Sequence, residues 1–523
     1  MGLDTFLYNL HFDVDKASPP DWEVDWEDAP LPYKLYRGLP VFPLSSEVPL
    51  TLEKWHEPAQ PTLRKIGHFL WYVFGLTQLS QTAFPSTEEA PELMQSFRRF
   101  VPSGGALYPS ELYMYLKTED LPVGVYHYDV AHHSLVLLRE GDFDSYISRA
   151  MGSRCDLSPC FGVAFVSTMF WKNYYKYNNF SYRLQGLDAG VLIGQLLEVA
   201  KRFGFSAGVY SQYLDRAMNH LLGLSEEEES VYAVVPLSVE LTRWFPNGDG
   251  REEILSATEL CRELPSIQAN HYVRSKKIKP FPMLTKINEA SMYESTKSFR
   301  QIETRQKEHR EDQVVSLPQV NRLTYDLASA CAKRFSPDMD FSQGKVSQSQ
   351  LAILLQESTS AFLYRNDLEE PYKRQEPRVS LYCCLNHVEG LPDGAYYYNH
   401  IEHTLHQIDP GDHRLRLQYG MPAGNVNLYH VPLCFHVVGD KDHFIDDLGY
   451  RGYRIQQMEA GMLVQRLLLT ASALEMGGHP LLGFDVSLCD DLYKIHSLGK
   501  TSLIQVPIGS YHPRPWLKGK LQS

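Results

Sequence analysis

Apolar residues recur every three to four positions in two stretches of the chain, 63–76 and 186–203, and this spacing predicts two amphipathic helices. Between them, the apolar segment 111–116, ELYMYL, follows two adjacent glycines and predicts a strand. Residues 1–60 are rich in proline, tryptophan and acidic residues instead. We expect them to form an extended arm that wraps around the rest of the protein.

The same pattern occurs twice in the chain. The segment 121–128, LPVGVYHY, returns as 391–398, LPDGAYYY. A second block, Tyr182 and Arg183 with DAG at 188–190, returns as Tyr453 and Arg454 with EAG at 459–461. Because one offset of about 270 residues holds through a hairpin, a loop and a helix, we predict two copies of one α+β domain.

The two copies would occupy residues 61–270 and 315–523, joined by a linker at 271–314 whose charged part, 288–313, is expected to be helical or loose. Such copies pack most simply as a pseudo-dimer within one chain, with a site where their surfaces meet. Each copy has kept different residues. The glycine-rich segment 102–109, PSGGALYP, has no glycines at its counterpart, 371–378, and Leu482 and Gly483 stand where the first copy has Gln212 and Tyr213.

Composition and charge limit the classes of function. A chain of 523 residues suits two or three domains, each with its own core. The formal charge of −13 argues against nucleic-acid binding, and the short basic run 275–279 is expected to be a solvated linker. With no signal segment, no apolar run long enough for a bilayer and eight scattered cysteines, we expect a cytoplasmic protein with reduced, mostly buried thiols and no zinc site.

Three small groups of residues are candidates for chemistry. Two adjacent glycines let the backbone approach a bulky partner, to which Ser103 offers a hydroxyl and an N–H, although a plain turn is the alternative. Arg334 and Ser336, near a predicted helix start, suit a phosphate, with a solvated surface pair as the alternative. The aromatic segment around Lys176 and Tyr177 is either part of a catalytic site or only the edge of an amphipathic, aromatic-rich helix. Histidines fall at the predicted hairpins and are expected to be surface residues rather than metal ligands: His132, His133, His400, His403 and His406.

The glycine-rich segment 102–109, the Gly-x-Tyr-x-Tyr hairpin, Lys176 with Tyr177, and the block around 182–190 together resemble SagB/McbC-type dehydrogenases. The resemblance covers most of the chain beyond residue 60 and is looser in the second copy. It implies two nitroreductase-like, FMN-binding domains in tandem. It also implies the oxidation of thiazolines and oxazolines in peptides to thiazoles and oxazoles.

In that family FMN lies between two protomers, and the resemblance divides its ligands between the two copies here. The second copy would hold the phosphate and the isoalloxazine, and the glycine-rich segment of the first would cover them. The implied cofactor-binding residues are Arg99, Pro102, Ser103, Gly104, Gly105, Arg334, Ser336, Leu482 and Gly483. For Arg99 a solvated surface position is the alternative. We expect one flavin site per chain, its symmetric counterpart having decayed.

The resemblance assigns Lys176 and Tyr177 to removal of the Cα proton of the azoline. Aromatisation removes that proton and a hydride, which the flavin N5 accepts, so a base must sit beside the flavin. A lysine there, away from water, would have a lowered pKa. Because no nicotinamide-binding fingerprint is visible, molecular oxygen is the expected electron acceptor.

Three alternatives stay open at this point: an NAD(P)H-dependent nitro or quinone reductase, a non-catalytic scaffold of a peptide-modifying complex, and a dehydrogenase of a non-azoline peptide. No separate domain for gripping a leader peptide is visible. We therefore expect a thiazoline carried by a nonribosomal peptide synthetase carrier protein, as for stand-alone oxidases of the bacillamide type. A ribosomal precursor peptide is the other substrate, and the formation of a homodimer is left open.

Overall fold

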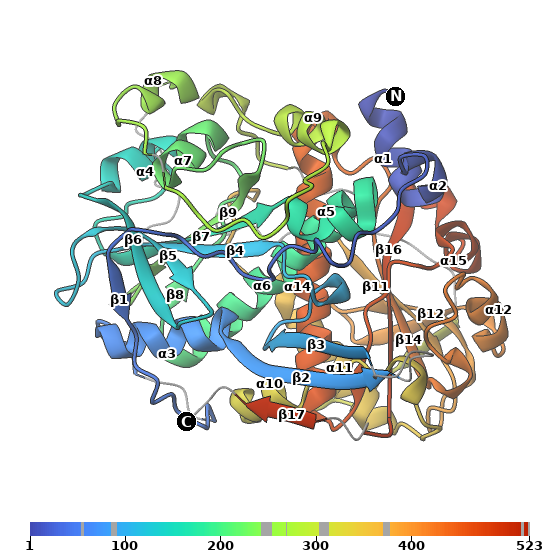
Figure 1. Ribbon diagram of the computed structural model, residues 1–523. Coiled ribbons are helices and arrows are strands. Elements are labelled where there is room, and N and C mark those ends of the chain that lie inside the picture. Colours follow the sequence, from blue (N-terminus) through green and yellow to red (C-terminus); the bar gives the residue numbers. More distant parts are fainter. Residues whose placement is uncertain are drawn as a thin grey trace.

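The protein contains two seven-stranded sheets on either side of a pair of long helices (Figure 1). The computed structural model describes residues 1–53, 57–84, 92–241, 254–267, 269–302, 313–369, 377–513 and 517–520. The first sheet contains β1 (Val41–Pro43), β4 (Ser110–Leu116), β5 (Gly124–Asp129), β6 (Ser134–Glu140), β7 (Cys160–Met169), β8 (Ser206–Ala207) and β9 (Glu229–Ser238). The second contains β10 (Gln313–Ser316), β11 (Ser380–Leu385), β12 (Gly394–Asn399), β13 (Thr404–Pro410), β14 (Leu433–Asp440), β15 (Gly477–Gly478) and β16 (Lys500–Gly509).

Helices of very different length accompany these sheets. Those of the first half are α1 (Leu3–Phe12), α2 (Val14–Ala17), α3 (Leu63–Phe74), α4 (Asp144–Ala150), α5 (Trp171–Tyr177), α6 (Ser181–Phe203), α7 (Asp215–Leu222) and α8 (Ala257–Cys261). Those that follow are α9 (Pro282–Ala290), α10 (Leu327–Lys333), α11 (Gln348–Thr359), α12 (Arg414–Tyr419), α13 (Ile445–Leu448), α14 (Arg451–Ala473) and α15 (Val486–Leu492). The two predicted helices are α3 and α6, and α6 begins five residues before the predicted start.

The predicted duplication is confirmed by the order of the strands. The first sheet runs β1-β6-β5-β4-β7-β9-β8 and the second β10-β13-β12-β11-β14-β16-β15, which is the same order in repeated elements. Even the irregularities recur, since the β5–β6 ladder shifts register between Val125 and Tyr126 and the β12–β13 ladder between Ala395 and Tyr396. The fold is α+β, with two domains of one design in tandem.

The repeated histidines stabilise the hairpins. The Tyr128 hydroxyl lies 2.8 Å from His133 Nδ1, and in the second copy the Tyr398 hydroxyl lies 2.7 Å from His403 Nδ1. A hydrogen bond within each hairpin therefore accounts for the recurrence of these two histidines.

The long helices α6 and α14 pack against each other at the centre of the molecule, between the two sheets (Figure 1). Residues that correspond in the repeat touch one another across this contact. The rings of Tyr182 and Tyr453 stack with centroids 5.7 Å apart, and Gln465 Nε2 donates to Gln195 Oε1 at 2.8 Å. Such contacts between equivalent residues place the pseudo-twofold axis between the two helices.

Glycines bring the backbones of the two helices together. A Cβ at Gly190 would lie 2.0 Å from the carbonyl oxygen of Met458, and a Cβ at Gly461 would lie 2.3 Å from that of Leu187. Only glycine fits at such distances. The repeated DAG and EAG segments therefore set the spacing of the two copies, and with it the shape of any site between them.

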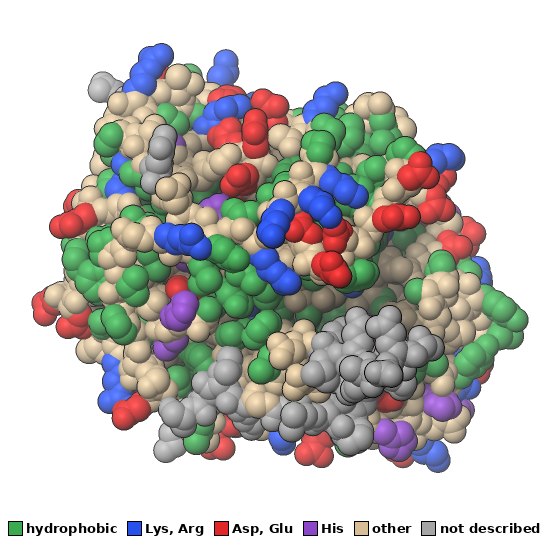
Figure 2. Space-filling view, in the orientation of Figure 1, with side chains coloured by type: hydrophobic (Ala, Val, Ile, Leu, Met, Phe, Trp, Pro, Cys, Tyr) green, Lys and Arg blue, Asp and Glu red, His purple; other side chains and the backbone are tan. Residues whose placement is uncertain are grey.

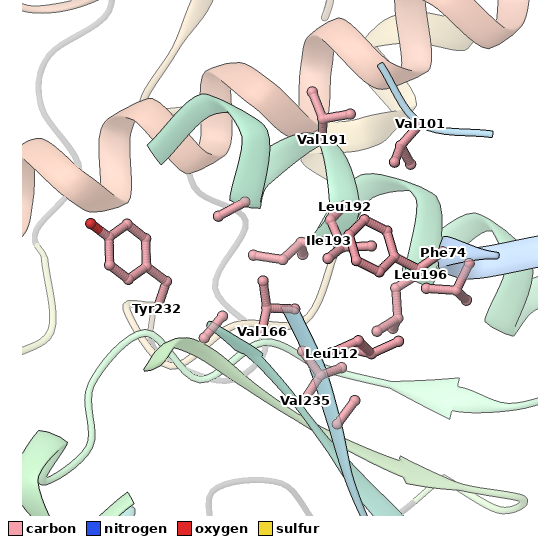
Figure 3. Close-up of a cluster of buried hydrophobic side chains, with 14 of the residues drawn as sticks. Phe74, Val101, Leu112, Val166, Val191, Leu192, Ile193, Leu196, Tyr232 and Val235 are labelled. Atoms are coloured by element: carbon pink, nitrogen blue, oxygen red, sulfur yellow. The ribbon is translucent and has the colours of Figure 1, made fainter. Parts of the chain in front are cut away.

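The opposite face of α6 builds the core of the first copy. Figure 3 shows Leu192, Ile193 and Leu196 of this helix directed toward side chains of the first sheet, whereas Val191 points to the other side of the helix. The labelled partners are Leu112, Val166 and Val235 of strands β4, β7 and β9. This burial fixes α6, whose other side faces α14, on the sheet.

The N-terminal arm wraps around the protein as expected, but it is not extended at its start. Residues 3–12 form α1, which lies on the second copy, where His11 Nε2 is 3.1 Å from the Ser502 carbonyl. Farther along, the Trp22 indole donates to the carbonyl of Tyr175, and β1 pairs with β6 of the first sheet. The helix forms because Phe6 and Leu10, four residues apart, are buried in a core that residues of both copies share.

The linker contains a helix, which ends within the charged segment 288–313 that was expected to be helical or loose. Residues 282–290 form α9, and the Asp28 carboxylate of the arm accepts the N–H groups of Lys276 and Lys277 at 2.7 and 2.8 Å. The basic run is therefore tied to the arm by an acidic residue. On the face that Figure 2 shows, basic side chains lie singly or beside acidic ones. Residues 303–312, within the charged segment expected to be helical or loose, lie outside the described residues.

A third sheet of β17 (Leu517–Lys520), β2 (Leu76–Phe84) and β3 (Glu92–Arg99) joins the end of the second copy to a hairpin of the first. The cysteines are unpaired, as predicted, and all but the half-buried Cys261 are buried. Among the described residues, no helix is both long enough and apolar enough to cross a membrane.

Candidate functional site

A cavity of about 650 Å³ lies where the two copies meet. The first copy lines it with the β2–β3 hairpin, the loop that follows, the end of α5 and one side of α6, and the second copy with the segments after α10 and before α15 and part of α14. The predicted site residues in its wall are Pro102, Ser103, Gly104, Gly105, Lys176, Tyr177, Arg334, Ser336, Leu482 and Gly483. Residues predicted on different copies thus surround one space.

The glycine loop, residues 102–109, is pressed against α6 and α5. A Cβ added at Gly104 would lie 2.8 Å from a methyl carbon of Leu184 on α6. Gly105 has a φ of 65°, and a Cβ there would lie 2.6 Å from the Tyr177 hydroxyl and 3.0 Å from Lys176 Nζ. The close approach that the two glycines predict is therefore made to the side chains of the Lys-Tyr pair as well as to the cavity.

Lys176 and Tyr177 end helix α5 at the cavity wall. Lys176 Nζ lies 4.9 Å from the centre of the Tyr177 ring and 5.4 Å from the centre of the Trp26 ring on the arm. Burial lowers the pKa of Lys176, since removal from water disfavours the ammonium form. Burial and the nearby Asp188 carboxylate raise the pKa of Tyr177 to about 12. The pair offers an amine that loses its proton more easily than usual, beside a neutral phenol.

Two arginines, one from each copy, line the same cavity. Arg334 follows α10 directly, and its Nε donates to the Phe100 carbonyl at 3.1 Å. Burial and the positive charge of Arg98 lower the pKa of Arg334 to about 9. Arg98 is the last residue but one of β3, and its buried Nη2 has no hydrogen-bond partner among the described residues. Together with Ser336, these groups could bind an anion such as phosphate.

Arg99 lies outside the cavity. Its guanidinium is buried 3.9 Å from the centre of the Phe74 ring and 4.7 Å from that of Tyr108, and it donates to the carbonyl of Pro32. Successive side chains of a strand point to opposite faces, so Arg98 faces the cavity and Arg99 the core. The expected additional cation is therefore Arg98, while Arg99 joins the arm to the first copy.

Leu482 and Gly483 present their backbone to the cavity. The segment is fixed on one side by the Leu481 N–H, which donates to Gln505 at 2.7 Å, and on the other by Asp485, which caps α15. Within the described part of the chain, the N–H groups of Leu482 and Gly483 meet no protein acceptor. A Cβ at Gly483 would have open space around it. Two backbone donors are thus available to a ligand.

At the symmetric position, protein side chains fill the space. Glu459, which corresponds to Asp188, accepts from Arg378 Nε at 2.8 Å and from the Tyr364 hydroxyl at 2.6 Å. The volume left beside these groups is about 20 Å³. An ion pair therefore stands where the open site has its cavity.

The backbone donors at the symmetric position are also occupied. The Asp367 carboxylate accepts the N–H of Ser211 at 2.8 Å and that of Gln212, the counterpart of Leu482, at 2.9 Å. Most of the segment 371–378, expected to replace the glycine loop, lies outside the described residues. The described residues of this second position support the expectation of one open site per chain.

The open cavity fits FMN in volume and in chemistry. Its size lies within the roughly 300–1,000 Å³ that is usual for cofactor sites. The Arg98 Nη2 without a partner and Arg334 would take the phosphate. The isoalloxazine ring would accept hydrogen bonds from the free N–H groups of Leu482 and Gly483. It would also pack on the glycine loop, where no side chain stands in the way.

Residues 76–237, from β2 to the end of β9, match the Nitroreductase family. This stretch is a nitroreductase-family domain. A crystal structure of a protein from Anabaena variabilis assigned as a nitroreductase is similar over 98% of this chain and 99% of that chain, with a TM-score of 0.74 and 19% identity. The predicted nitroreductase-like fold is confirmed, and the similarity extends through both copies.

Two further proteins are similar over shorter stretches. The trifolitoxin-processing protein TfxB from Rhizobium leguminosarum bv. trifolii is 32% identical over 119 residues, which are 21% of this chain and 31% of that protein's length. The E. coli microcin synthetase McbBCD complex with truncated pro-MccB17 bound is 18% identical over 39% of this chain and 69% of that chain, with a TM-score of 0.27.

Arg98 and Asp188 are among the residues of the cavity wall that had no predicted role. Arg98 could have been chosen from the sequence only by knowing which way β3 faces. Asp188, in the repeated DAG segment, lines the cavity and accepts from the Ser103 hydroxyl at 2.6 Å. Its signal was an acidic residue between apolar neighbours within a predicted helix, which is unusual unless the carboxylate has partners.

Proposed function

We propose that the protein is an FMN-dependent oxidase that converts a thiazoline or oxazoline in a peptide to the thiazole or oxazole. The observation that carries this proposal is the cavity that brings the Lys176-Tyr177 pair and the glycine loop of one copy together with Arg334 and the 482–483 backbone of the other. Each half carries a different part of the chemistry, and neither is complete alone.

The cofactor would be held mainly by charge and by backbone donors. Arg334, Ser336 and Arg98 would bind the phosphate, since two guanidinium groups that line the same cavity, one of them on a buried residue, are stabilised by an anion. The N–H groups of Leu482 and Gly483 would bind polar atoms of the ring edge. Ser103, Gly104 and Gly105, next to Pro102, would close the site from the first copy.

In the proposed reaction Lys176 acts as the base. Its lowered pKa raises the fraction of neutral amine, which can take the Cα proton of an azoline bound in the cavity. Tyr177 stays protonated, and its hydroxyl can hold the substrate or the lysine by a hydrogen bond. When bound, FMN supplies the acceptor for the hydride that leaves the neighbouring ring carbon, and molecular oxygen is the proposed final electron acceptor.

The peptide nature of the substrate is supported by the similarity to a protein named for trifolitoxin processing. A carrier protein of a nonribosomal peptide synthetase or a ribosomal precursor peptide would present the azoline. The unpaired cysteines support the cytoplasm as the proposed place of action. An NAD(P)H-dependent nitro or quinone reductase is the second candidate, favoured by the match to the Nitroreductase family.

The proposal is tested with Lys176→Ala, loaded with FMN and assayed on a synthetic peptide containing a thiazoline-4-carboxamide. We expect flavin retention close to that of the wild type and a loss of thiazole formation of at least a hundredfold, because the base contributes roughly 10²–10⁴-fold. Lys201→Ala, at a partly exposed lysine of α6 distant from the cavity lining, is the matched control and should be fully active.

Full activity of Lys176→Ala would remove the proposed base. Wild-type protein that binds FMN and oxidises NAD(P)H, but leaves the thiazoline unchanged, would establish the reductase instead. Protein that stays colourless after FMN is added would contradict both and favour the scaffold.

A further inference from the structure

We propose that Asp188 is a positioning residue that holds the glycine loop against the Lys176-Tyr177 pair. In its catalytic part this inference rests on the proposed function. The loop, the carboxylate and the pair are all in the cavity wall, and the loop contacts both of the others.

Asp188 is joined to the loop by two hydrogen bonds. The Ser103 hydroxyl donates to one carboxylate oxygen at 2.6 Å, and the Gly104 N–H is 3.3 Å from the other. Ser103 Oγ in turn accepts the N–H of Tyr108 at 2.9 Å. Both ends of the loop from residue 103 to 108 are thus tied, directly or through Ser103, to one carboxylate on α6.

The loop that Asp188 holds is in contact with the proposed base. Gly105 follows the two residues bound by Asp188 and passes so close to Tyr177 and Lys176 that a Cβ would lie 2.6 Å from the hydroxyl and 3.0 Å from Nζ. Release of Ser103 and Gly104 would let this backbone move away. Lys176 and Tyr177 would then lose their contact with the backbone of Gly105. The substrate would no longer pack against a loop that is held in one place.

Asp188 is half-buried in the cavity wall, at a place where its hydrogen-bond partners carry no positive charge. The Ser103 hydroxyl and the Gly104 N–H are its neutral partners, and burial raises the pKa of its carboxyl to about 7. At the symmetric position Glu459 is paired with Arg378 instead, and the space is closed. A carboxylate without a cation is costly for folding, so its presence beside the open cavity points to a role in the site.

The experiment compares Asp188→Asn, which keeps one acceptor oxygen, with Asp188→Ala, which keeps none. Hydrogen–deuterium exchange of residues 103–108 is measured first in the flavin-free protein at pH 8. We expect exchange at least tenfold faster in Asp188→Ala, an intermediate effect in Asp188→Asn, and no change in strands β4 and β7.

The same variants are then loaded with FMN and assayed on the thiazoline peptide. We expect kcat to fall tenfold or more in Asp188→Ala with a smaller change in KM, and the melting temperature of Asp188→Asn at pH 8 to rise above that of the wild type. A residue with only a structural role would lower both stability and activity. Asp129→Asn is the matched control, since Asp129 also accepts loop N–H groups but in the β5–β6 turn.

Unchanged exchange in residues 103–108 of Asp188→Ala would overturn the inference, as would a kcat equal to that of the wild type in a protein whose wild type is active. If exchange increases as expected but the wild type does not act on the thiazoline, the proposed function fails and the positioning of the loop stands.

Discussion

Arg98 and Arg334 are the residues through which the cavity would hold a negative charge. Arg334 is buried and Arg98 is half-buried, each comes from a different copy, and the positive charge of Arg98 contributes to the lowered pKa of Arg334. A phosphate between them would remove this repulsion and give the buried Nη2 of Arg98 an acceptor. The guanidinium of Arg99, the next residue along the chain, packs on the rings of Phe74 and Tyr108 and does not line the cavity.

The two adjacent arginines should therefore differ when they are replaced. Arg98→Ala should weaken FMN binding by about 10- to 100-fold, the effect of a lost charge-assisted hydrogen bond of roughly 1.5–3 kcal/mol. Arg99→Ala should leave FMN binding within about threefold and lower the free energy of unfolding by roughly 2 kcal/mol, because it loses buried packing. Fluorescence titration with FMN and urea denaturation distinguish the two. Equal effects on flavin binding would contradict the assignment.

The raised pKa of Asp188 leads us to expect that the stability of the flavin-free protein depends on pH. Its carboxyl has a pKa of about 7 in the folded protein and an ordinary value of 3.8. Between these values the folded form keeps a proton that the unfolded chain has lost, so the free energy of unfolding falls as the pH rises and levels off above pH 7.

Asp188→Asn should remove this dependence of the free energy of unfolding on pH, because asparagine carries no titratable group. At pH 8 the variant should be more stable than the wild type by roughly 2–4 kcal/mol, and near pH 4 the two should be similar. Urea denaturation at both pH values measures the difference. A variant that is less stable than the wild type at pH 8 would show that the carboxylate has a partner that compensates its charge.

At the scale of elements, the N-terminal arm connects both copies to the site. Its helix α1 lies on the second copy, and the following residues cross to α5, where Trp22 binds the carbonyl of Tyr175. Trp26 is 60% exposed, yet its ring lies over Lys176 Nζ. The arm thereby adds an aromatic face next to the proposed base, which favours the ammonium form through a cation–π interaction.

The contribution of this ring is measured with Trp26→Leu, which keeps apolar bulk over the lysine and removes the aromatic face. We expect the limb of the kcat–pH profile that reports Lys176 to move to lower pH by about half a unit, since a cation–π contact at an exposed site is worth roughly 0.5–1 kcal/mol. Trp26→Phe should keep most of the wild-type profile. A limb that stays in place in Trp26→Leu would show that the ring does not act on the charge of Lys176.

At the scale of the whole molecule, a duplicated fold contains two different interfaces. On one side of the α6–α14 pair the copies enclose a cavity of about 650 Å³, and on the other Arg378 and Glu459 leave about 20 Å³. Once two copies are joined in one chain, their sequences can change independently. One position can then keep the cofactor while the other becomes part of the core.

This asymmetry predicts one flavin per chain. After saturation with FMN and removal of the excess, the absorbance of the released flavin should give a ratio to protein close to one. Glu459→Gln should leave the ratio unchanged, because the second position also lacks free backbone donors at Ser211 and Gln212. A ratio close to two would refute the closure of the second position.

Much of the fold followed from the sequence, because repeats and hydrophobic spacing are local properties. The duplication, the helices α3 and α6 and the α+β class were all predicted, as was the division of the candidate site into two halves. The arm was predicted to wrap, but α1 was not predicted, since its stability comes from the burial of Phe6 and Leu10 against a distant part of the chain. Arg99, predicted to bind the cofactor or to lie on the surface, is instead buried outside the cavity, because the sequence does not state which face of a hairpin meets the other copy.

By itself, then, the sequence determined that two copies of one domain are present and that a glycine loop, a Lys-Tyr pair and an Arg-x-Ser segment survive on different copies. Only the tertiary structure decided that these groups surround one cavity, that Arg98 and Asp188 belong to it, and that Arg378 closes its counterpart. The physical reason is the contact between α6 and α14, where Gly190 and Gly461 set the distance between the copies. Packing between residues far apart in the chain then decides which side chains line the cavity. A local sequence pattern does not predict this packing.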